Sequence, residues 1–298
     1  MRKFIVSDLH GDGNIYNSII SYLENVAMYS NEKVELYING DLIDRGYASG
    51  DMLVDVIDRC NYDNLIDIKY LAGNHEYMMW LESFYLKDGK WRNNSHWVYN
   101  GGYATSSFLE RYLTDEETNY VINFISNLKL YHKFEEKICG KKIVLVHSKC
   151  PSKVSSNCNL KIKDNTDEVY DLVWSRAGED GVNKVGNKNY FTIIGHTAVN
   201  TPTGFMYDRF DNVMNIDGGC AYYMFGVTKY DHVPLVEVED EKLTILTFNN
   251  NNEIIYGNSY SNGEFKEIDN LDEYRKFLNP KVKLLHLYKK DGDYFFAE

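Results

Sequence analysis

The sequence lacks any apolar run long enough to span a bilayer. Its opening, "MRKFIVSDLHGDG", has only Phe4 to Ser7 between Lys3 and Asp8, which is too short for the apolar region of a secretory signal peptide. Positive charge is also scarce, because 32 Lys and Arg face 44 Asp and Glu, for a net charge of −12. Binding to a phosphate backbone or an anionic lipid surface draws on clustered Lys and Arg. We therefore expect a protein with neither a nucleic-acid nor a membrane partner.

Cysteine pairs of the CxxC type are missing as well. The five cysteines are an odd number and fit no closed disulfide framework: Cys60, Cys139, Cys150, Cys158 and Cys220. Reduced thiols are usual in the cytosol. We therefore expect a cytoplasmic protein.

What the sequence does contain is an alternation of short apolar runs with amphipathic segments. "KFIV", "VELYI" and "LIDIKYL" predict strands, and each is followed by a segment with helical periodicity. Two more helices are predicted at 103–113 and 115–128, then a hairpin of "HKFEEKI" and "IVLVHS". Further strands are predicted at "FTIIGHT", "VMNID", "YYMFGVT", "PLVEVE" and "LTILTF". The pattern indicates an α/β (α+β) fold, a sandwich of sheets with outer helices.

An asparagine run, "NNNNE" at 249–253, marks a predicted domain boundary. Residues 1–248 would form the catalytic domain, and residues 249–298 a C-terminal extension of unassigned role. The extension is predicted to hold a short helix near "LDEYRKFL" and a β-hairpin that turns at Asp291-Gly292.

Five of the apolar runs end in side chains that can bind a metal. These side chains are Asp8 and His10, Asp41, the group Asn74-His75-Glu76, His147, and His196. Each alone has an ordinary explanation, such as a capped turn or a histidine satisfied in the core. In an open α/β sheet, however, ligands bind at the carboxyl ends of the strands, so the five runs would deliver their side chains to one edge.

The chemistry of these side chains points to a pair of transition-metal ions. Carboxylate, imidazole and amide oxygen suit Mn²⁺, Fe or Zn²⁺ better than Ca²⁺ or a thiolate site. There are too many ligands for one tetrahedral ion, whereas two ions about 3.5–4 Å apart with a bridging carboxylate would use them all. We expect two divalent ions, with Mn²⁺ as the first choice.

The motifs "DLHG", "GDLIDRG", "GNHE", "LVHS" and "IIGHT", in this order, resemble the phosphoprotein phosphatase family of calcineurin-like metallophosphoesterases. The resemblance runs from about residue 4 to 220 and is closest to bacterial and phage-type serine/threonine protein phosphatases. "LVWSR" and "WVYNGG" also resemble segments of the family, while "NIDGG" departs from it with Gly218 in place of Thr. The resemblance implies a four-layer sandwich of two mixed sheets flanked by helices.

The resemblance also implies a role for each site residue. The first ion would be held by Asp8, His10 and Asp41, and the second by Asp41 as the bridge, Asn74, His147 and His196. Phosphate would be bound by Arg45, Arg176 and Asn74. His75 would be the general acid, oriented by Asp44. The alternatives are a surface ion pair for Arg45 and a helix N-cap for Asp44.

These roles predict hydrolysis of a phosphomonoester on a phosphorylated protein or a small phosphoester. A water that bridges both ions would lose a proton and attack phosphorus in line. The expected activity is that of a serine/threonine or dual-specificity protein phosphatase. The alternative is a dinucleoside polyphosphate hydrolase of the same fold, in which aromatic side chains would stack on adenine: Trp91, Trp97, Tyr99 and Tyr103. The sequence indicates neither the natural substrate nor the oligomeric state.

Three other classes of function are disfavoured. Nucleases and cyclic-nucleotide phosphodiesterases of this superfamily carry "GHxH", but Ala198 replaces the second histidine here. The sequence around Cys150 lacks the glycine-rich anion nest and the arginine that a cysteine-nucleophile phosphatase needs. A non-catalytic scaffold would have lost a ligand, and every expected ligand is present.

Overall fold

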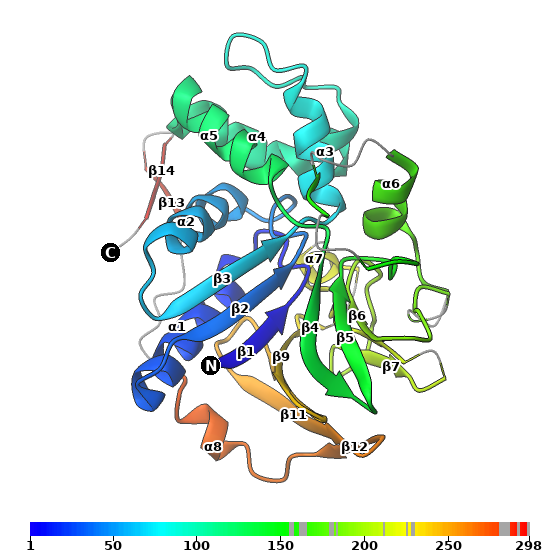
Figure 1. Cartoon of the computed structure of the whole chain (residues 1–298). Coiled ribbons are helices and arrows are strands. Elements are labelled where there is room, and N and C mark those ends of the chain that lie inside the picture. The colour runs from blue at the N-terminus through cyan, green and yellow to red at the C-terminus, as the bar shows by residue number, and fades with distance from the viewer. Residues whose placement is uncertain are drawn as a thin grey trace.

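Two mixed β-sheets flanked by helices make up the fold, which confirms the predicted class (Figure 1). The seven-stranded sheet has the order β12-β11-β10-β9-β1-β2-β3 and the five-stranded sheet the order β4-β5-β6-β8-β7. The computed structural model describes residues 1–154, 158–160, 166–178, 182, 184–210, 212–224, 226–227, 230–279, 287–290 and 293–296. No helix among these residues is long and apolar enough to cross a membrane.

The larger sheet combines a parallel half with an antiparallel half. The parallel strands β1 (Arg2–Val6), β2 (Val34–Asn39) and β3 (Ile66–Leu71) are connected through α1 (Gly13–Ser30) and α2 (Ser49–Tyr62). The antiparallel strands continue from the other side of β1: β9 (Val233–Glu239), β10 (Lys242–Phe248), β11 (Ile254–Ser261) and β12 (Glu264–Glu267).

The smaller sheet also has three adjacent parallel strands. These are β5 (Lys141–Val146), β6 (Phe191–Ile194) and β8 (Val213–Asn215). The antiparallel strands β4 (Tyr131–Ile138) and β7 (Met206–Asp208) form its edges. Each sheet therefore presents three parallel carboxyl ends in a row.

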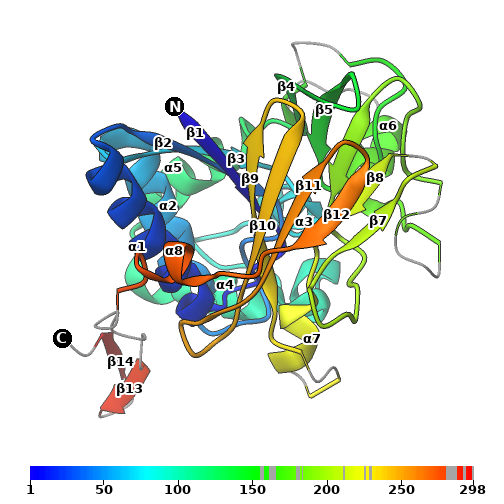
Figure 2. The ribbon, with the colours of Figure 1, turned by 90° about the horizontal axis from the view of Figure 1, so that it is seen from below.

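The remaining helices lie around the two sheets (Figures 1 and 2). They are α3 (Asn74–Ser83), the π-helical turn η1 (Val98–Gly102), α4 (Tyr103–Tyr112), α5 (Asp115–Ser126), α6 (Thr166–Trp174), α7 (Cys220–Met224) and α8 (Asp272–Arg275). A separate antiparallel ribbon pairs β13 (Leu287–Lys290) with β14 (Asp293–Phe296).

Alternation along the central strands divides the core in two. In β1, Phe4 and Val6 join the cluster that includes the helices, whereas Ile5 joins the cluster between the two sheets. In β5, Leu145 faces the space between the sheets and Val144 packs on the side of α6. A strand covered on both faces must be apolar throughout, which explains the unbroken apolar runs of the sequence.

The segment after β8 differs from the prediction. "YYMFGVT" is predicted as a strand, but its first residues belong to the helix α7, so that prediction is wrong. Gly219 reverses the chain at φ +82°, and its carbonyl accepts the amides of Tyr222 and Tyr223 at 2.9 and 3.2 Å. This local turn overrides the strand preference of the aromatic residues.

The C-terminal region begins as part of the larger sheet. Strand β11, which lies beyond residue 248, pairs with β10 along its length, and neither β11 nor β12 is predicted from the sequence. Helix α8 falls within "LDEYRKFL". The predicted turn residues Asp291 and Gly292 lie outside the described residues, and the domain boundary at 248/249 stays a prediction.

Candidate metal centre

Polar side chains from six strand ends meet between the two sheets. Strands β1, β2 and β3 of the larger sheet and β5, β6 and β8 of the smaller one each end next to one of them. These side chains are Asp8 and His10, Asp41, Asn74, His147, His196 and Asp217. All are buried. The structure thus brings together every predicted metal ligand and adds one carboxylate, Asp217.

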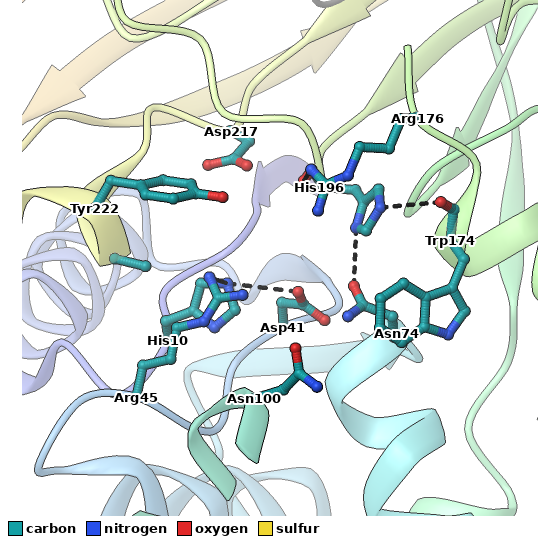
Figure 3. Close-up of a pocket in the computed structure, with 11 residues that line it drawn as sticks. His10, Asp41, Arg45, Asn74, Asn100, Trp174, Arg176, His196, Asp217 and Tyr222 are labelled. Atoms are coloured by element: carbon teal, nitrogen blue, oxygen red, sulfur yellow. Dashed lines mark hydrogen bonds and ion pairs between the residues drawn. The ribbon is translucent and has the colours of Figure 1, made fainter. Parts of the chain in front are cut away.

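Asn74 lies at the centre of one group of ligands. Its Oδ1 lies 3.1 Å from Nε2 of His147 and 2.8 Å from Nδ1 of His196 (Figure 3 shows the second contact). Oδ1 of Asp41 lies 3.4 Å from the same His147 nitrogen. Side-chain atoms of Asp41, His147 and His196 approach within 4.8 Å of one another, as the ligands of one ion do.

Backbone carbonyls orient these two histidines. Nδ1 of His147 lies 2.8 Å from the carbonyl of Asn39, and Nε2 of His196 lies 3.2 Å from that of Trp174. Because a carbonyl only accepts, each ring can keep a proton on that nitrogen while its other nitrogen offers a lone pair to a bound ion.

The buried carboxylates of the group favour a positive charge beside them. Burial and the positive charge of His147 lower the pKa of His196 to about 3, so its ring is neutral. Burial also lowers the pKa of His147, but the carboxylates of Asp41 and Asp8 outweigh this effect and raise it to about 10. Without a metal, a proton on His147 supplies the positive charge that the buried carboxylates need.

The second group of ligands surrounds His10. Its Nδ1 lies 3.2 Å from the carbonyl of Ile43, and its Nε2 lies 3.4 Å from Oδ2 of Asp41. Asp41 therefore directs one carboxylate oxygen toward each group, as a bridging ligand must.

Asp8 completes this second group, and its carboxylate is closely surrounded by protein atoms. Both of its carboxylate oxygens accept the backbone N–H of His196 at 3.1 Å, and it also accepts the hydroxyl of Ser7. Burial and the carboxylate of Asp217 raise the pKa of Asp8 well above its usual value. Any side chain at Gly195 would collide with it, because a Cβ there would lie 2.0 Å from Oδ2 of Asp8.

The backbone of the ligands is itself unusual. Asp8, His10, Asp41 and His196 have positive φ angles of 56°, 45°, 50° and 66°. Non-glycine residues occupy this left-handed region rarely, and such residues cluster at functional sites.

Glu76, the last residue of "GNHE", does not face the ligands. Its carboxylate accepts the backbone amides of Asp41, Leu42 and Gly73 at 2.9, 3.1 and 2.8 Å. It thereby ties the loop after β2 to the loop after β3. Its role is to hold Asp41 in place.

His75 and Asp44 form a buried pair next to the ligands. Nδ1 of His75 lies 2.7 Å from Oδ2 of Asp44, and the N–H donates to the carboxylate. The N-cap alternative for Asp44 is wrong, because α2 begins only at Ser49 and its N-cap is Ala48.

Arg45 directs its guanidinium into the site rather than to a surface carboxylate. Its two terminal nitrogens lie 3.0 Å from Nε2 of His10 and 3.0 Å from Nε2 of His75. A planar fork of donors is therefore held between a predicted metal ligand and the predicted general acid.

A pocket with about 380 Å³ of open space gives access to the site (Figure 3). Of the predicted residues, it is lined by His10, Asp41, Arg45, Asn74, Arg176 and His196, whereas Asp8, His75 and His147 do not line it. Arg176 lies opposite Arg45 and donates to the carbonyl of His196 at 3.4 Å.

The lining includes residues that are not predicted from the sequence: Asn100, Trp174, Asp217, Ala221 and Tyr222. Asp217 is a buried carboxyl group, and burial raises its pKa to about 6. It follows "VMNI" as Asp8 follows "FIVS", so the rule of a carboxylate after a strand would have found it.

The structure bears on two points of the sequence analysis, the stacking aromatic side chains and the disfavoured cysteine nucleophile. Trp91 and Trp97 are buried and pack edge to face with their ring centres 4.8 Å apart, so neither is free to stack on a base, whereas Tyr99 and Tyr103 are exposed. Burial raises the pKa of the Cys150 thiol to about 11, which is the opposite of what a nucleophilic cysteine needs.

Comparison with known proteins agrees with this geometry. A family model described as calcineurin-like phosphoesterase matches residues 1–226. None of the curated proteins matches. Enzymes of the matched family use two divalent metal ions, and the His and Asp clusters of the structure fit such a site.

Solved structures with the same fold include phosphatases of two specificities. A protein serine/threonine phosphatase from Saccharomyces cerevisiae, with similarity to human PP5, is 14% identical at a TM-score of 0.53, over 84% of this chain and 80% of its own. A cold-active protein-tyrosine phosphatase of a psychrophilic Shewanella is 13% identical at a TM-score of 0.50, over 90% and 80%. At this identity the likeness shows the fold alone.

Proposed function

The chain belongs to the calcineurin-like phosphoesterase family, and we propose that it is a phosphomonoester hydrolase that acts on phosphorylated proteins. Serine/threonine or dual specificity is the activity proposed. Two divalent ions, Mn²⁺ first among them and Fe or Zn²⁺ as alternatives, are the proposed cofactors, because carboxylate, imidazole and amide donors suit these metals. The free thiols of the cysteines favour a cytoplasmic location.

One observation carries the proposal. Arg45 lies 3.0 Å from both His10 and His75, so the proposed phosphate-binding fork, metal ligand and proton donor meet at one point. A protein phosphatase needs all three groups around a single phosphoryl group.

The proposed ligands divide between the two ions as the sequence motifs indicate. One ion would be held by Asp8, His10 and Asp41, and the other by Asp41, Asn74, His147 and His196. When bound, the two ions would supply Lewis-acid activation of the attacking water and neutralise charge on the phosphate.

Side chains of the protein would bind the phosphate and donate the proton. Arg45 and Arg176, on opposite sides of the pocket, would bind the phosphate oxygens and hold the ester oxygen toward His75. The amide nitrogen of Asn74 can donate to a phosphate oxygen while its Oδ1 faces the histidines. With both of its nitrogens protonated and Arg45 turned from Nε2 to the phosphate, His75 would donate the Nε2 proton to the departing oxygen, while Asp44 keeps the Nδ1 proton in place.

The test compares metal-stripped protein with protein refilled with Mn²⁺. The substrates are a phosphoserine/threonine peptide, a phosphotyrosine peptide, 4-nitrophenyl phosphate and diadenosine tetraphosphate. Faster turnover of the phosphopeptides than of the dinucleotide supports the proposal. The reverse order would instead assign the chain as a dinucleoside polyphosphate hydrolase.

Arg45→Lys tests the phosphate fork. Charge-assisted hydrogen bonds contribute about 1.5–3 kcal/mol each, so losing one should lower kcat/KM at least about tenfold. Arg59→Lys is the control, because Arg59 lies on α2 and pairs with Glu24, Asp55 and Asp63. Equal activity of Arg45→Lys and the wild type would contradict the proposed role.

A further inference from the structure

The carboxylate of Asp44 has more partners than the pairing with His75 requires. Oδ2 accepts from Nδ1 of His75 at 2.7 Å and from the indole Nε1 of Trp97 at 2.6 Å. Oδ1 accepts from the hydroxyl of Thr105 at 2.5 Å. All four side chains are buried. Of the three donors, only His75 has a role in the proposed reaction.

The two additional donors fix the carboxylate in space. An indole N–H can only donate, so Trp97 defines one direction in the plane of the carboxylate. The Thr105 hydroxyl donates to Oδ1 and also accepts the backbone N–H of Asp44 itself at 3.2 Å. Asp44 is thus held at its backbone and at both carboxylate oxygens, and its orientation sets that of His75.

The segment from Trp97 to Thr105 is built around this contact. The carbonyl of Gly101 accepts the backbone N–H of Arg45 at 3.0 Å, and Gly101 has a φ of 101°, which favours glycine. A Cβ at Gly102 would lie 2.6 Å from the indole of Trp97. The "NGG" of the sequence therefore allows the segment to pack against both Trp97 and Arg45.

The hydrogen bonds at Asp44 also hold the backbone there in an unfavourable conformation. Asp44 and Arg45 have φ angles of 73° and 70°. Two successive non-glycine residues in this region persist only where their surroundings fix them, and strain of this kind marks functional positions.

We infer that Trp97 and Thr105 are positioning residues for proton donation by His75, an inference that depends on the proposed phosphatase function. As water adds to phosphorus and gives up one proton to solvent, the bond to the ester oxygen breaks and that oxygen keeps the electron pair. It takes the Nε2 proton of His75, which is protonated on both nitrogens, and His75 retains the Nδ1 proton that is donated to Asp44. Trp97 and Thr105 act by fixing the position of Asp44. Asp44 in turn orients His75 so that its Nε2 is in line with the departing oxygen.

Trp91 provides a matched control within the same aromatic pair. It is buried and packs edge to face on Trp97, but its indole N–H has no hydrogen-bond partner among the described residues. Trp97→Phe and Trp91→Phe therefore remove the same group from neighbouring positions. Only the first takes a donor away from Asp44.

Two substrates with different leaving groups distinguish a positioning role of Trp97 and Thr105 from a merely structural one. 4-Nitrophenolate leaves without a proton, whereas the serine alkoxide of a phosphopeptide does not. For Trp97→Phe with Mn²⁺, we expect kcat on a phosphoserine peptide to fall about tenfold, with KM and the kcat on 4-nitrophenyl phosphate within about twofold of the wild type. Trp91→Phe should leave both substrates within about twofold. Thr105→Val should lower kcat on the phosphoserine peptide as Trp97→Phe does. Thr105→Ser, which keeps the hydroxyl, should have a kcat close to that of the wild type.

Equal losses on both substrates in Trp97→Phe and Thr105→Val, or equal effects of Trp91→Phe and Trp97→Phe, would overturn the inference. Manganese content and thermal unfolding are measured for each variant. If Trp97→Phe does not fold, the comparison of Thr105→Val with Thr105→Ser decides the question. Failure of the wild-type protein to hydrolyse either phosphomonoester would contradict the proposed function instead.

Discussion

Oδ1 of Asn74 lies 2.8 Å from Nδ1 of His196 and 3.1 Å from Nε2 of His147. The outer ring nitrogens face backbone carbonyls: Nε2 of His196 faces that of Trp174, and Nδ1 of His147 faces that of Asn39. With their protons on those outer nitrogens, the two rings and the amide oxygen would direct lone pairs toward one point, as the ligands of one ion do. The arrangement therefore fits a cation site in the protein itself.

Asn74→Ala should weaken the binding of Mn²⁺ by at least about tenfold, since changes even to groups that only support a ligand lower metal affinity by about 10–100-fold. Isothermal titration calorimetry of the metal-stripped protein measures this affinity. Asn61→Ala on the surface of α2 is the control. Unchanged affinity in Asn74→Ala would contradict the assignment of Asn74 as a ligand.

Gly195→Ala should displace Asp8 and reduce bound manganese, because the new Cβ would lie 2.0 Å from Oδ2 of Asp8. Gly140→Ala is the control, since a Cβ there meets nothing within 4 Å and the change only strains a turn with φ +71°. We expect that strain to destabilise the fold by about 1–2 kcal/mol without loss of metal. Metal content is measured by elemental analysis after gel filtration, and full manganese content in Gly195→Ala would argue against Asp8 as a ligand.

Asp217→Asn should stabilise the metal-free protein and weaken its affinity for Mn²⁺. Asp217 is a buried carboxyl group that raises the pKa of Asp8, so neutralising it relieves repulsion between like charges when no cation is present. The gain in unfolding free energy should be on the order of 1–2 kcal/mol at pH 7. Urea denaturation with and without Mn²⁺ measures both effects. A loss of stability in the metal-free state would show that Asp217 has a structural role instead.

His132 should make the fold sensitive to acid. Partial burial and the positive charges of Lys129 and Lys3 lower its pKa to about 4, from 6.5 in the unfolded chain. Between these values the unfolded state binds more protons, so stability falls as the pH drops from about 6.5 toward 4.

Over this pH range His132 should lower the free energy of unfolding by about 1–2 kcal/mol, a figure that allows for the partial exposure of its side chain to solvent. His132→Gln removes the titrating group and should flatten the stability curve over this pH range. Denaturant unfolding of the wild type and the variant at several pH values measures the difference. Identical curves would show that the charged form of His132 is tolerated in the fold.

The sequence was most informative where a polar residue directly follows an apolar run. A strand buried on both faces must be apolar throughout, and the residue that follows it lies at the sheet edge, so the positions of Asp8, Asp41 and His147 could be predicted without a structure. Strands β5, β6 and β8 of the second sheet were predictable for the same reason, whereas β7 was not predicted.

Contacts that depend on tertiary structure were not predictable. The bonds from Trp97 and Thr105 to Asp44 join residues 53 and 61 positions apart, and neither donor has a local pattern that would identify its partner. The strand β11 has Gly257, Asn258 and Ser259 at its centre in place of an apolar alternation, so its pairing with β10 was missed. Helix α7 depends on a glycine turn that the aromatic residues after it obscure.

The left-handed backbone of Asp8, His10, Asp41 and His196 has a consequence for the evolution of the protein. Conformations of this kind cost about 1–3 kcal/mol each, and glycine would adopt them without that penalty. Selection for heat resistance alone, with no demand for catalysis, should therefore favour glycine at these four positions. The proposed metal ligands are the residues that a purely stability-driven lineage would lose first.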